Sequence, residues 1–283
     1  MNVPKGKLIP IGGNEAKGPA EQTDDDRSPL VDFFHSGILK EVLDEIRGEQ
    51  SRIEVIPSAS SVPDEMREMY DEAFEHLNLR QVGYLDIRSR GEAHAAENLK
   101  RLEQADGVIF TGGDQVKLTE ILAGTPFFDL LKRRYQEEPF VIAGTSAGAM
   151  AMSHFMIREG NSAEPLLKGM VDTGQGFGLL PQAIIDTHFM NRGRLARMTE
   201  ALMRHPECIA LGISEDTGLV ITGEDTMRAI GSGVIIVIEA DEIIKTNYHH
   251  ANEFEPVYIE NLRLHILAQG ASYSLRQRRF IEH

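Results

Sequence analysis

The sequence contains one cysteine, Cys208, no tryptophan and few aromatic residues, which make up 6% of 283 residues. A single cysteine cannot form an intramolecular disulfide bond, so a disulfide-stabilised fold is excluded. Cys208 lies in the apolar stretch 207–211, which is typical of a buried strand, and we assign it no catalytic role. Hydrophobic residues make up 41% of the chain, which is enough for a substantial core.

Basic residues are scarce as well. The 29 lysines and arginines are outnumbered by 44 aspartates and glutamates, and the net charge is −15. This charge argues against nonspecific binding to nucleic acid or to an anionic membrane. No segment is apolar for long enough to span a bilayer, and residues 1–7 lead into a strand-like run without an apolar leader. We therefore expect a cytoplasmic protein with no nucleic-acid or membrane partner.

Strand-like and helix-like segments alternate through the first half of the chain. Short apolar runs at residues 7–13, 52–57, 82–87, 107–110 and 140–143 are expected to be strands, and segments of helical periodicity separate them. This alternation predicts an α/β fold, in which helices cover both faces of a parallel sheet and loops at the carboxyl ends of the strands build the site. From residue 209 onward, short β-rich runs predict an antiparallel extension. No repeat or linker interrupts the chain, so we expect one domain spanning residues 1–283.

The fifth predicted strand runs directly into the pattern G-x-S-x-G at residues 144–148, which places Ser146 between two glycines. A serine at a sharp turn from strand to helix projects its hydroxyl above the edge of the sheet, and the glycines avoid the clash that a Cβ would cause. Good helix formers follow Ser146, so the hydroxyl would also lie in the positive field of a helix N-terminus. The pattern alone is loose. A nucleophile needs a base, a group that orients the base, and donors for an oxyanion.

Candidates for each of these groups are present. His188 ends the strand-like run 184–189, which we expect in the same sheet as Ser146, and it is the best base among ten histidines. Glu215 follows another strand-like run and is the best orienting carboxylate, although a cap or turn residue is an equally good interpretation. For the oxyanion, the backbone N–H of Ala147 follows the nucleophile, and the glycine turn at Gly113 could bring a second N–H close. The adjacent histidines at 249–250 have no third ligand at a recognisable spacing, so we expect no metal.

These motifs together resemble the cyanophycinases, which belong to a serine peptidase family that also contains the aspartyl dipeptidases called peptidase E. The resemblance covers essentially the whole chain. The matching blocks are residues 12–13, 111–115, 144–149, 186–189 with the arginines that follow, 212–217 and 271–275.

The resemblance implies a three-layer sandwich with a mostly parallel sheet, similar to the flavodoxin-like fold of class I glutamine amidotransferases, with a β-rich C-terminal extension. It also implies a hydrolase of the serine protease class that is cytoplasmic, forms a homodimer and uses no cofactor. The expected catalytic residues are Ser146 as nucleophile, His188 as base and Glu215 as its partner. The expected reaction is proteolysis of cyanophycin, a poly-aspartate with arginine on each β-carboxylate, to β-aspartyl-arginine dipeptides.

The resemblance also implies a set of substrate-binding residues, because Gln115 and Asp186 match positions that hold substrate in the family. The arginines Arg192, Arg194 and Arg197 follow His188, and the planar guanidinium suits bidentate capture of carboxylates. Alternatively, these arginines are solvated or paired with acidic residues of this acidic chain.

Two positions depart from the family pattern, since Thr187 stands where glutamine is common and Ser214 where aspartate is common. Substrate selection is therefore less well defined than the triad. An α-aspartyl dipeptidase with the same triad is the nearest alternative. A noncatalytic binding protein on the same fold is another, since a fold does not fix function, but the joint presence of serine, histidine and glutamate argues against it.

Overall fold

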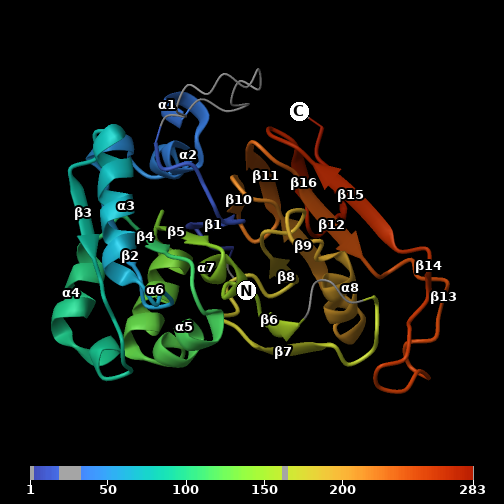
Figure 1. Ribbon diagram of the computed structural model, residues 1–283. Helices are drawn as coiled ribbons and strands as arrows, with labels where there is room; N and C mark the ends of the chain where they lie inside the picture. Colours follow the sequence, from blue (N-terminus) through green and yellow to red (C-terminus); the bar gives the residue numbers. More distant parts are fainter. Residues whose placement is uncertain (1–2, 19–32, 161–164, 283) are drawn as a thin grey trace.

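The computed structural model describes residues 3–18, 33–160 and 165–282 (Figure 1). Its largest sheet has nine strands. In spatial order they are β17 (Arg279–Phe280), β16 (Ser272–Ser274), β11 (Thr226–Gly231), β10 (Thr217–Thr222), β1 (Lys7–Ile11), β5 (Val141–Thr145), β4 (Gly107–Phe110), β2 (Arg52–Ile56) and β3 (Gln81–Tyr84).

The five strands that precede Ser146 form the parallel half of this sheet. All pairings from β3 through β2, β4 and β5 to β1 are parallel, as the alternation of strands and helices predicts. From β1 onward, the pairings through β10, β11, β16 and β17 are antiparallel, and these strands come from the C-terminal part of the chain. The sheet is therefore mixed, and its parallel half ends at β1, beside the strand that carries Ser146.

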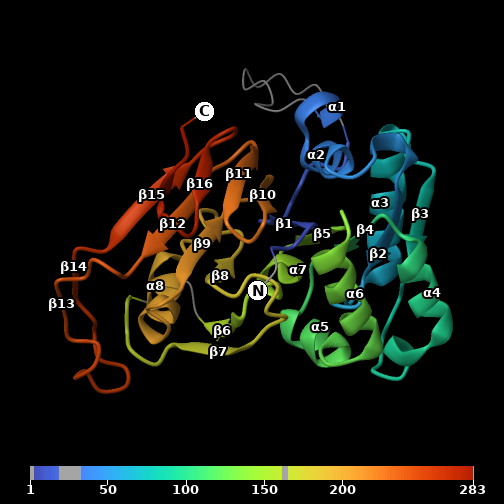
Figure 2. The same ribbon diagram turned by 180° about the vertical axis from the view of Figure 1, so that it is seen from behind.

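Helices cover both faces of the parallel half. The helices are α1 (Phe33–Ser36), α2 (Ile38–Asp44), α3 (Pro63–His76), α4 (Ala96–Gln104), α5 (Gln115–Leu122), α6 (Pro126–Glu137), α7 (Ala147–Met150) and α8 (Leu195–Arg204), with short 3₁₀ turns η1 (Gly48–Gln50) and η2 (Glu92–His94). Figures 1 and 2 show the helix-rich part beside the β-rich C-terminal part from opposite sides.

Alternation along the strands explains the two faces, because successive side chains of a strand point to opposite sides. One face of the sheet, with Ile9, Ile109 and Ala143, packs against apolar residues of α2 and α3 in one buried cluster. The other face, with Val108 and Ile142, belongs to a second buried cluster that includes residues of α5 and α6. The parallel strands therefore lie between two helical layers, which fixes the edge of the sheet where the loops gather.

A second sheet of four strands lies in the C-terminal part. Its order is β15 (Arg263–Leu267), β12 (Ile235–Glu239), β9 (Ile209–Ile213) and β8 (Ala183–Asp186). The strand before His188, β8, is in this sheet and pairs in parallel with β9, so our expectation that it shares a sheet with Ser146 is wrong. The apolar run of β8 suits any buried strand and does not specify its partner.

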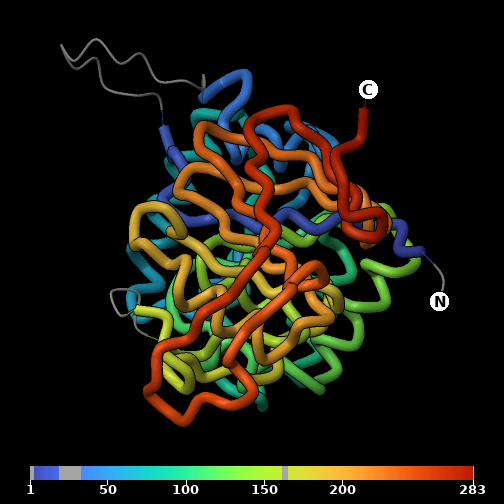
Figure 3. The backbone as a smooth tube through the Cα atoms, turned by 90° about the vertical axis from the view of Figure 1, so that its right-hand side faces the viewer, coloured from blue at the N-terminus to red at the C-terminus, as the bar shows by residue number. Residues whose placement is uncertain are grey.

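Two small antiparallel pairs complete the strands. They are β6 (Phe155–Gly160) with β7 (Val171–Gln175), and β13 (Lys245–Thr246) with β14 (Ile259–Glu260). Figure 3 shows the C-terminal segments, orange to red, crossing in front of the rest of the chain. Within the part of the chain that the structure describes, no helix is both long and apolar enough to cross a membrane.

Candidate active site

Ser146 occupies a strained turn between β5 and α7. Its backbone has φ 49° and ψ −109°, a combination that non-glycine residues rarely adopt, and its N–H donates to the Ile11 carbonyl at 2.9 Å. The flanking glycines are needed sterically. A Cβ on Gly144 would lie 2.6 Å from the Gly148 carbonyl carbon, and a Cβ on Gly148 would lie 2.6 Å from the Phe110 carbonyl oxygen. The helix that follows, α7, is short: it begins at Ala147 and ends at Met150.

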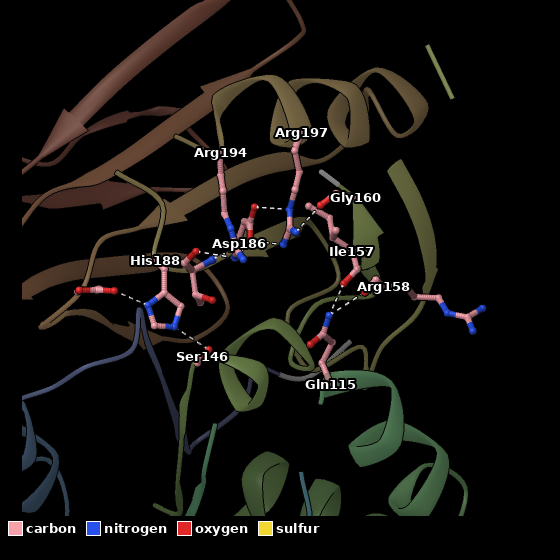
Figure 4. Close-up of polar contacts among 11 residues, drawn as sticks. Gln115, Ser146, Ile157, Arg158, Gly160, Asp186, His188, Arg194 and Arg197 are labelled. Carbon is pink, nitrogen blue, oxygen red and sulfur yellow. Dashed lines mark hydrogen bonds and ion pairs between the residues drawn. The ribbon is translucent and has the colours of Figure 1, made fainter. Parts of the chain in front are cut away.

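Three side chains from separate loops meet at this turn. Ser146 Oγ lies 3.0 Å from His188 Nε2 (Figure 4). His188 Nδ1 lies 2.7 Å from Glu215 Oε1. Ser146 follows β5, His188 follows β8, and Glu215 lies between β9 and β10. The three groups therefore come from both sheets. A carboxylate that accepts from Nδ1–H leaves Nε2 free to accept the serine proton, which is the arrangement that activates a serine hydroxyl.

The environment of Glu215 keeps it charged. The hydrogen bond from His188 is the main cause that lowers the pKa of Glu215, and hydrogen bonding from Asn14 lowers it further. Asn191 Nδ2 also donates to Glu215 Oε2 at 3.1 Å. The sequence did not single out either asparagine, and only their positions close to Gly13 and His188 could have indicated them.

Two glycines at the end of β1 hold the histidine loop. The backbone N–H of His188 donates to the Gly12 carbonyl, and the N–H of Asp216 donates to the Gly13 carbonyl, both at 2.9 Å. Gly13 has φ 102°, and a Cβ there would lie 2.4 Å from His188 Cε1. Sequence reasoning treated this pair as the end of a strand, but its contact with the imidazole is a site function that it missed.

The glycine turn after β4 lies beside the serine. A Cβ on Gly112 would be 3.6 Å from the Cβ of Ser146, and a Cβ on Gly113, whose φ is 139°, would be 2.1 Å from the Ala59 carbonyl oxygen. Among the described residues, the backbone N–H groups of Gly113 and Ala147 have no hydrogen-bond partner. Two backbone donors are thus available near Ser146, which is what an oxyanion requires.

Asp186 does not present its carboxylate to the site. It is fully buried, and both oxygens are occupied: Arg194 Nη1 and Arg197 Nη2 donate to Oδ1 at 2.8 Å, and Arg197 Nε donates to Oδ2 at 3.0 Å. Arg194 also donates to the Thr187 carbonyl and Arg197 to the Gly160 carbonyl. Figure 4 shows both arginines reaching from the start of α8 toward Asp186.

This cluster involves three of the expected substrate-binding residues, Asp186, Arg194 and Arg197. Arg194 and Arg197 are each only 8% exposed, and their guanidinium groups bind Asp186 and backbone carbonyls. The pairing with an acidic residue, which we considered as the alternative, is the one observed. The burial of Arg194 also lowers its pKa, and the charge of Asp186 opposes this shift.

The remaining expected substrate-binding residues, Arg192 and Gln115, are more accessible. Arg192 is exposed in the turn after His188. Gln115, at the start of α5, is partly buried, and its Nε2 donates to the carbonyls of Ile157 and Arg158 at 3.0 Å. Figure 4 shows its side chain directed toward this backbone.

The two departures from the family pattern lie next to the triad. Thr187 and Ser214 are buried, and neither hydroxyl has a hydrogen-bond partner among the described residues. In the same part of the chain, no group of three or more histidine, cysteine, aspartate or glutamate side chains is arranged to hold a metal ion.

The chain is similar to known peptidases and cyanophycinases. The sequence pattern of peptidase family S51 matches residues 33–229. A cyanophycinase of Synechococcus elongatus is 36% identical over 272 residues, which cover 96% of this chain and 80% of that protein. A cyanophycinase of Geminocystis herdmanii is 35% identical over 270 residues, which cover 95% of this chain and 94% of that protein.

A solved structure, a peptidase from an acI-B1 Actinobacterium, has a similar fold. Its TM-score is 0.66 at 20% identity, and the likeness covers 97% of this chain and 98% of that one.

Proposed function

The chain belongs to peptidase family S51, and from this premise we propose that it is a cyanophycinase that uses a Ser-His-Glu triad to release β-aspartyl-arginine dipeptides. Family membership makes it a serine-type peptidase. The names of its relatives support cyanophycin as the substrate. The observation that carries the mechanism is the continuous contact from Ser146 Oγ through His188 to Glu215.

The contacts of the triad support a sequence of proton transfers. Ser146 Oγ attacks the scissile carbonyl carbon while His188 Nε2 takes its proton, and Glu215 holds the imidazole and stabilises its positive charge. The N–H groups of Gly113 and Ala147 stabilise the oxyanion of the tetrahedral intermediate. His188 then gives the proton to the leaving amine, so that the C–N bond breaks and an acyl-enzyme remains. Water, deprotonated by His188, hydrolyses this ester and restores the serine.

Arg192 is our candidate for binding a substrate carboxylate. Each unit of cyanophycin carries the free carboxylate and the guanidinium of its arginine, and a guanidinium of the protein can bind the former in a bidentate contact. Gln115 is our second candidate for contact with substrate: its Nε2 is occupied by backbone oxygens, so its side-chain carbonyl remains to accept a hydrogen bond from the guanidinium of the substrate.

The decisive experiment is incubation of the purified protein with cyanophycin and identification of the products by mass spectrometry, with Ser146→Ala as the control. Dipeptides of β-linked aspartate and arginine support the proposal. Faster cleavage of short α-aspartyl dipeptides than of the polymer would identify an α-aspartyl dipeptidase instead. Binding of the polymer without any cleavage would identify a noncatalytic protein.

We further propose that the protein is a single-domain cytoplasmic homodimer. The support for dimerisation is β15, which forms one edge of the second sheet and exposes Leu264 by 43% and Ile266 by 57%. Exposed apolar side chains favour association with another chain. An edge strand also presents backbone groups that can pair with a strand of a second copy.

A further inference from the structure

A buried carboxylate lies behind the nucleophile. The side chain of Glu15 is only 1% exposed, although it belongs to the segment that follows β1 rather than to a strand or helix. It accepts three hydrogen bonds: from Thr145 Oγ1 at 2.5 Å, from Tyr70 OH at 2.9 Å and from Lys17 Nζ at 3.1 Å. A buried charge needs such a set of partners, so the position of this carboxylate is tightly defined.

Thr145 connects this carboxylate to the reacting atoms. It is the last residue of β5, and the next residue, Ser146, has the strained backbone of the turn. Strained geometry persists only where the surroundings over-determine it. Two anchors flank the turn on this side: the bond from Ser146 N–H to the Ile11 carbonyl, and the bond from the Thr145 hydroxyl to Glu15.

The same segment also touches the acid end of the triad. The N–H of Ala16 donates to Asp216 Oδ1 at 3.0 Å, and Asp216 follows Glu215 in the chain. Together with the glycine carbonyls that accept from the His188 and Asp216 backbones, residues 12–17 contact the loops of all three catalytic groups.

The remaining partners keep Glu15 in place from the far side. Burial, with the nearby Glu15 charge as a further cause, raises the pKa of Tyr70 well above its ordinary value, so its hydroxyl stays protonated and donates. Lys17, two residues along, balances the charge of the carboxylate. Glu15 is therefore held from both sides, and Thr145 is its link to the nucleophile.

We infer that Glu15 is a positioning residue, which acts through the Thr145 hydroxyl to hold Ser146 Oγ in line with His188 Nε2. This inference rests on the proposed function, in that Ser146 must be the nucleophile. The carboxylate does not touch substrate and takes no part in proton transfer. Its effect is on the rate at which Ser146 reacts, because displacement of a reacting group by about 1 Å can cost on the order of 100-fold in rate.

The test measures the reactivity of Ser146 without the natural substrate. A fluorophosphonate probe phosphonylates activated serines, with fluoride as the leaving group. The rate of labelling at Ser146 is measured by mass spectrometry for wild type, Glu15→Gln, Thr145→Val, the double variant of these two changes, and Thr145→Ser. The matched control is Glu54→Gln, which alters another carboxylate with 1% side-chain exposure, one that pairs with Arg101. Melting temperatures of all variants report stability separately.

We expect Glu15→Gln and Thr145→Val to slow labelling about tenfold or more, and the double variant to be little slower than either single one, because both act through one contact. Thr145→Ser, which retains the hydroxyl, should label close to the wild-type rate. In Glu15→Gln and Thr145→Val, the kcat for cyanophycin should fall, and KM should be nearly unchanged. Glu54→Gln should lower the melting temperature without slowing the labelling of the folded protein.

Two results would overturn the inference. If Glu15→Gln and Thr145→Val lower the melting temperature but label at the wild-type rate, then Glu15 only stabilises the fold, while the assignment of Ser146 stands. If the wild-type protein is not labelled at Ser146, then both the proposed nucleophile and this inference fail.

Discussion

At the scale of single residues, three non-glycine residues of the site have a positive φ, which residues with a side chain rarely adopt. Ser146, His188 and Asp216 have φ values of 49°, 50° and 45°. Such conformations cost about 1–3 kcal/mol each and persist where the surrounding structure enforces them. All three residues lie in the loops that carry the proposed triad, so part of the stability of the fold is spent on the geometry of this site.

Two replacements of Ser146 distinguish its effect on activity from the effect of its strained backbone on stability. Ser146→Ala and Ser146→Gly should each reduce turnover about 10³-fold or more, because nucleophile and base act as a unit, and His188→Ala should cost about as much. The glycine variant should be more stable than the alanine variant by about 1 kcal/mol, since glycine adopts this backbone without strain. Denaturant unfolding and peptidase assays measure the two effects. Near-normal activity of either variant would exclude Ser146 as the nucleophile.

The arginines near His188 should behave in opposite ways. Loss of the exposed side chain in Arg192→Ala should raise KM about tenfold, because a charge-assisted hydrogen bond is worth about 1.5–3 kcal/mol, and kcat should change less. Arg194→Ala should instead cost about 3–5 kcal/mol of stability, because it leaves a buried carboxylate with fewer partners. Kinetics and thermal unfolding of the two variants distinguish these roles. Unchanged KM in Arg192→Ala would mean that this arginine is only solvated.

Glu215 should contribute to stability in a pH-dependent way. Its pKa is lowered in the folded protein, so its charged form is favoured by folding. The contribution is fully present above the ordinary glutamate pKa of about 4.3 and is lost as the pH falls through the lower folded value. The difference in unfolding free energy between wild type and Glu215→Gln should therefore be constant from about pH 7 to 5.5 and shrink below about pH 4. A difference that grows on acidification would contradict the shift.

At the scale of elements, sequence reasoning works where a local pattern has one physical outcome. The alternation of apolar strands and amphipathic segments correctly predicts the parallel half of the large sheet, and G-x-S-x-G predicts the turn at Ser146. The location of β8 was missed, because a short buried strand carries no information about its neighbour. For the same reason the burial of Asp186 against two arginines could not be read from spacing, although ion pairing was one of the open interpretations.

The turn after β1 can be tested with a matched pair of glycines. Gly13→Ala should remove most of the activity, because its Cβ would lie 2.4 Å from His188 Cε1 and would displace the imidazole. Gly124 also has a positive φ, 66°, but a Cβ there meets nothing within 4 Å. Gly124→Ala should therefore cost about 1 kcal/mol of stability and leave kcat unchanged. Equal activities of the two variants would show that the imidazole tolerates the added methyl group.

At the scale of the whole molecule, we expect the edge strand β15, with its exposed Leu264 and Ile266, to form the dimer interface. We expect a mass of about twice 31.5 kDa by light scattering. Ile266→Glu places a charge on β15 and should shift the protein toward the monomer, because a charge on an edge strand blocks pairing. Lys100→Gln, on α4 far along the chain from β15, makes the net charge more negative by one as Ile266→Glu does and is the matched control. An unchanged mass in Ile266→Glu would exclude β15 as the interface.

The proposed triad is divided between the two sheets, since Ser146 follows β5 of the larger one and His188 follows β8 of the smaller one. The proposed catalytic unit is consequently not contained in either sheet alone. Recombination that transplanted either sheet into another protein would transfer an incomplete set of groups, without a functioning active site. Transfer of the proposed activity to another protein would therefore require both sheets together.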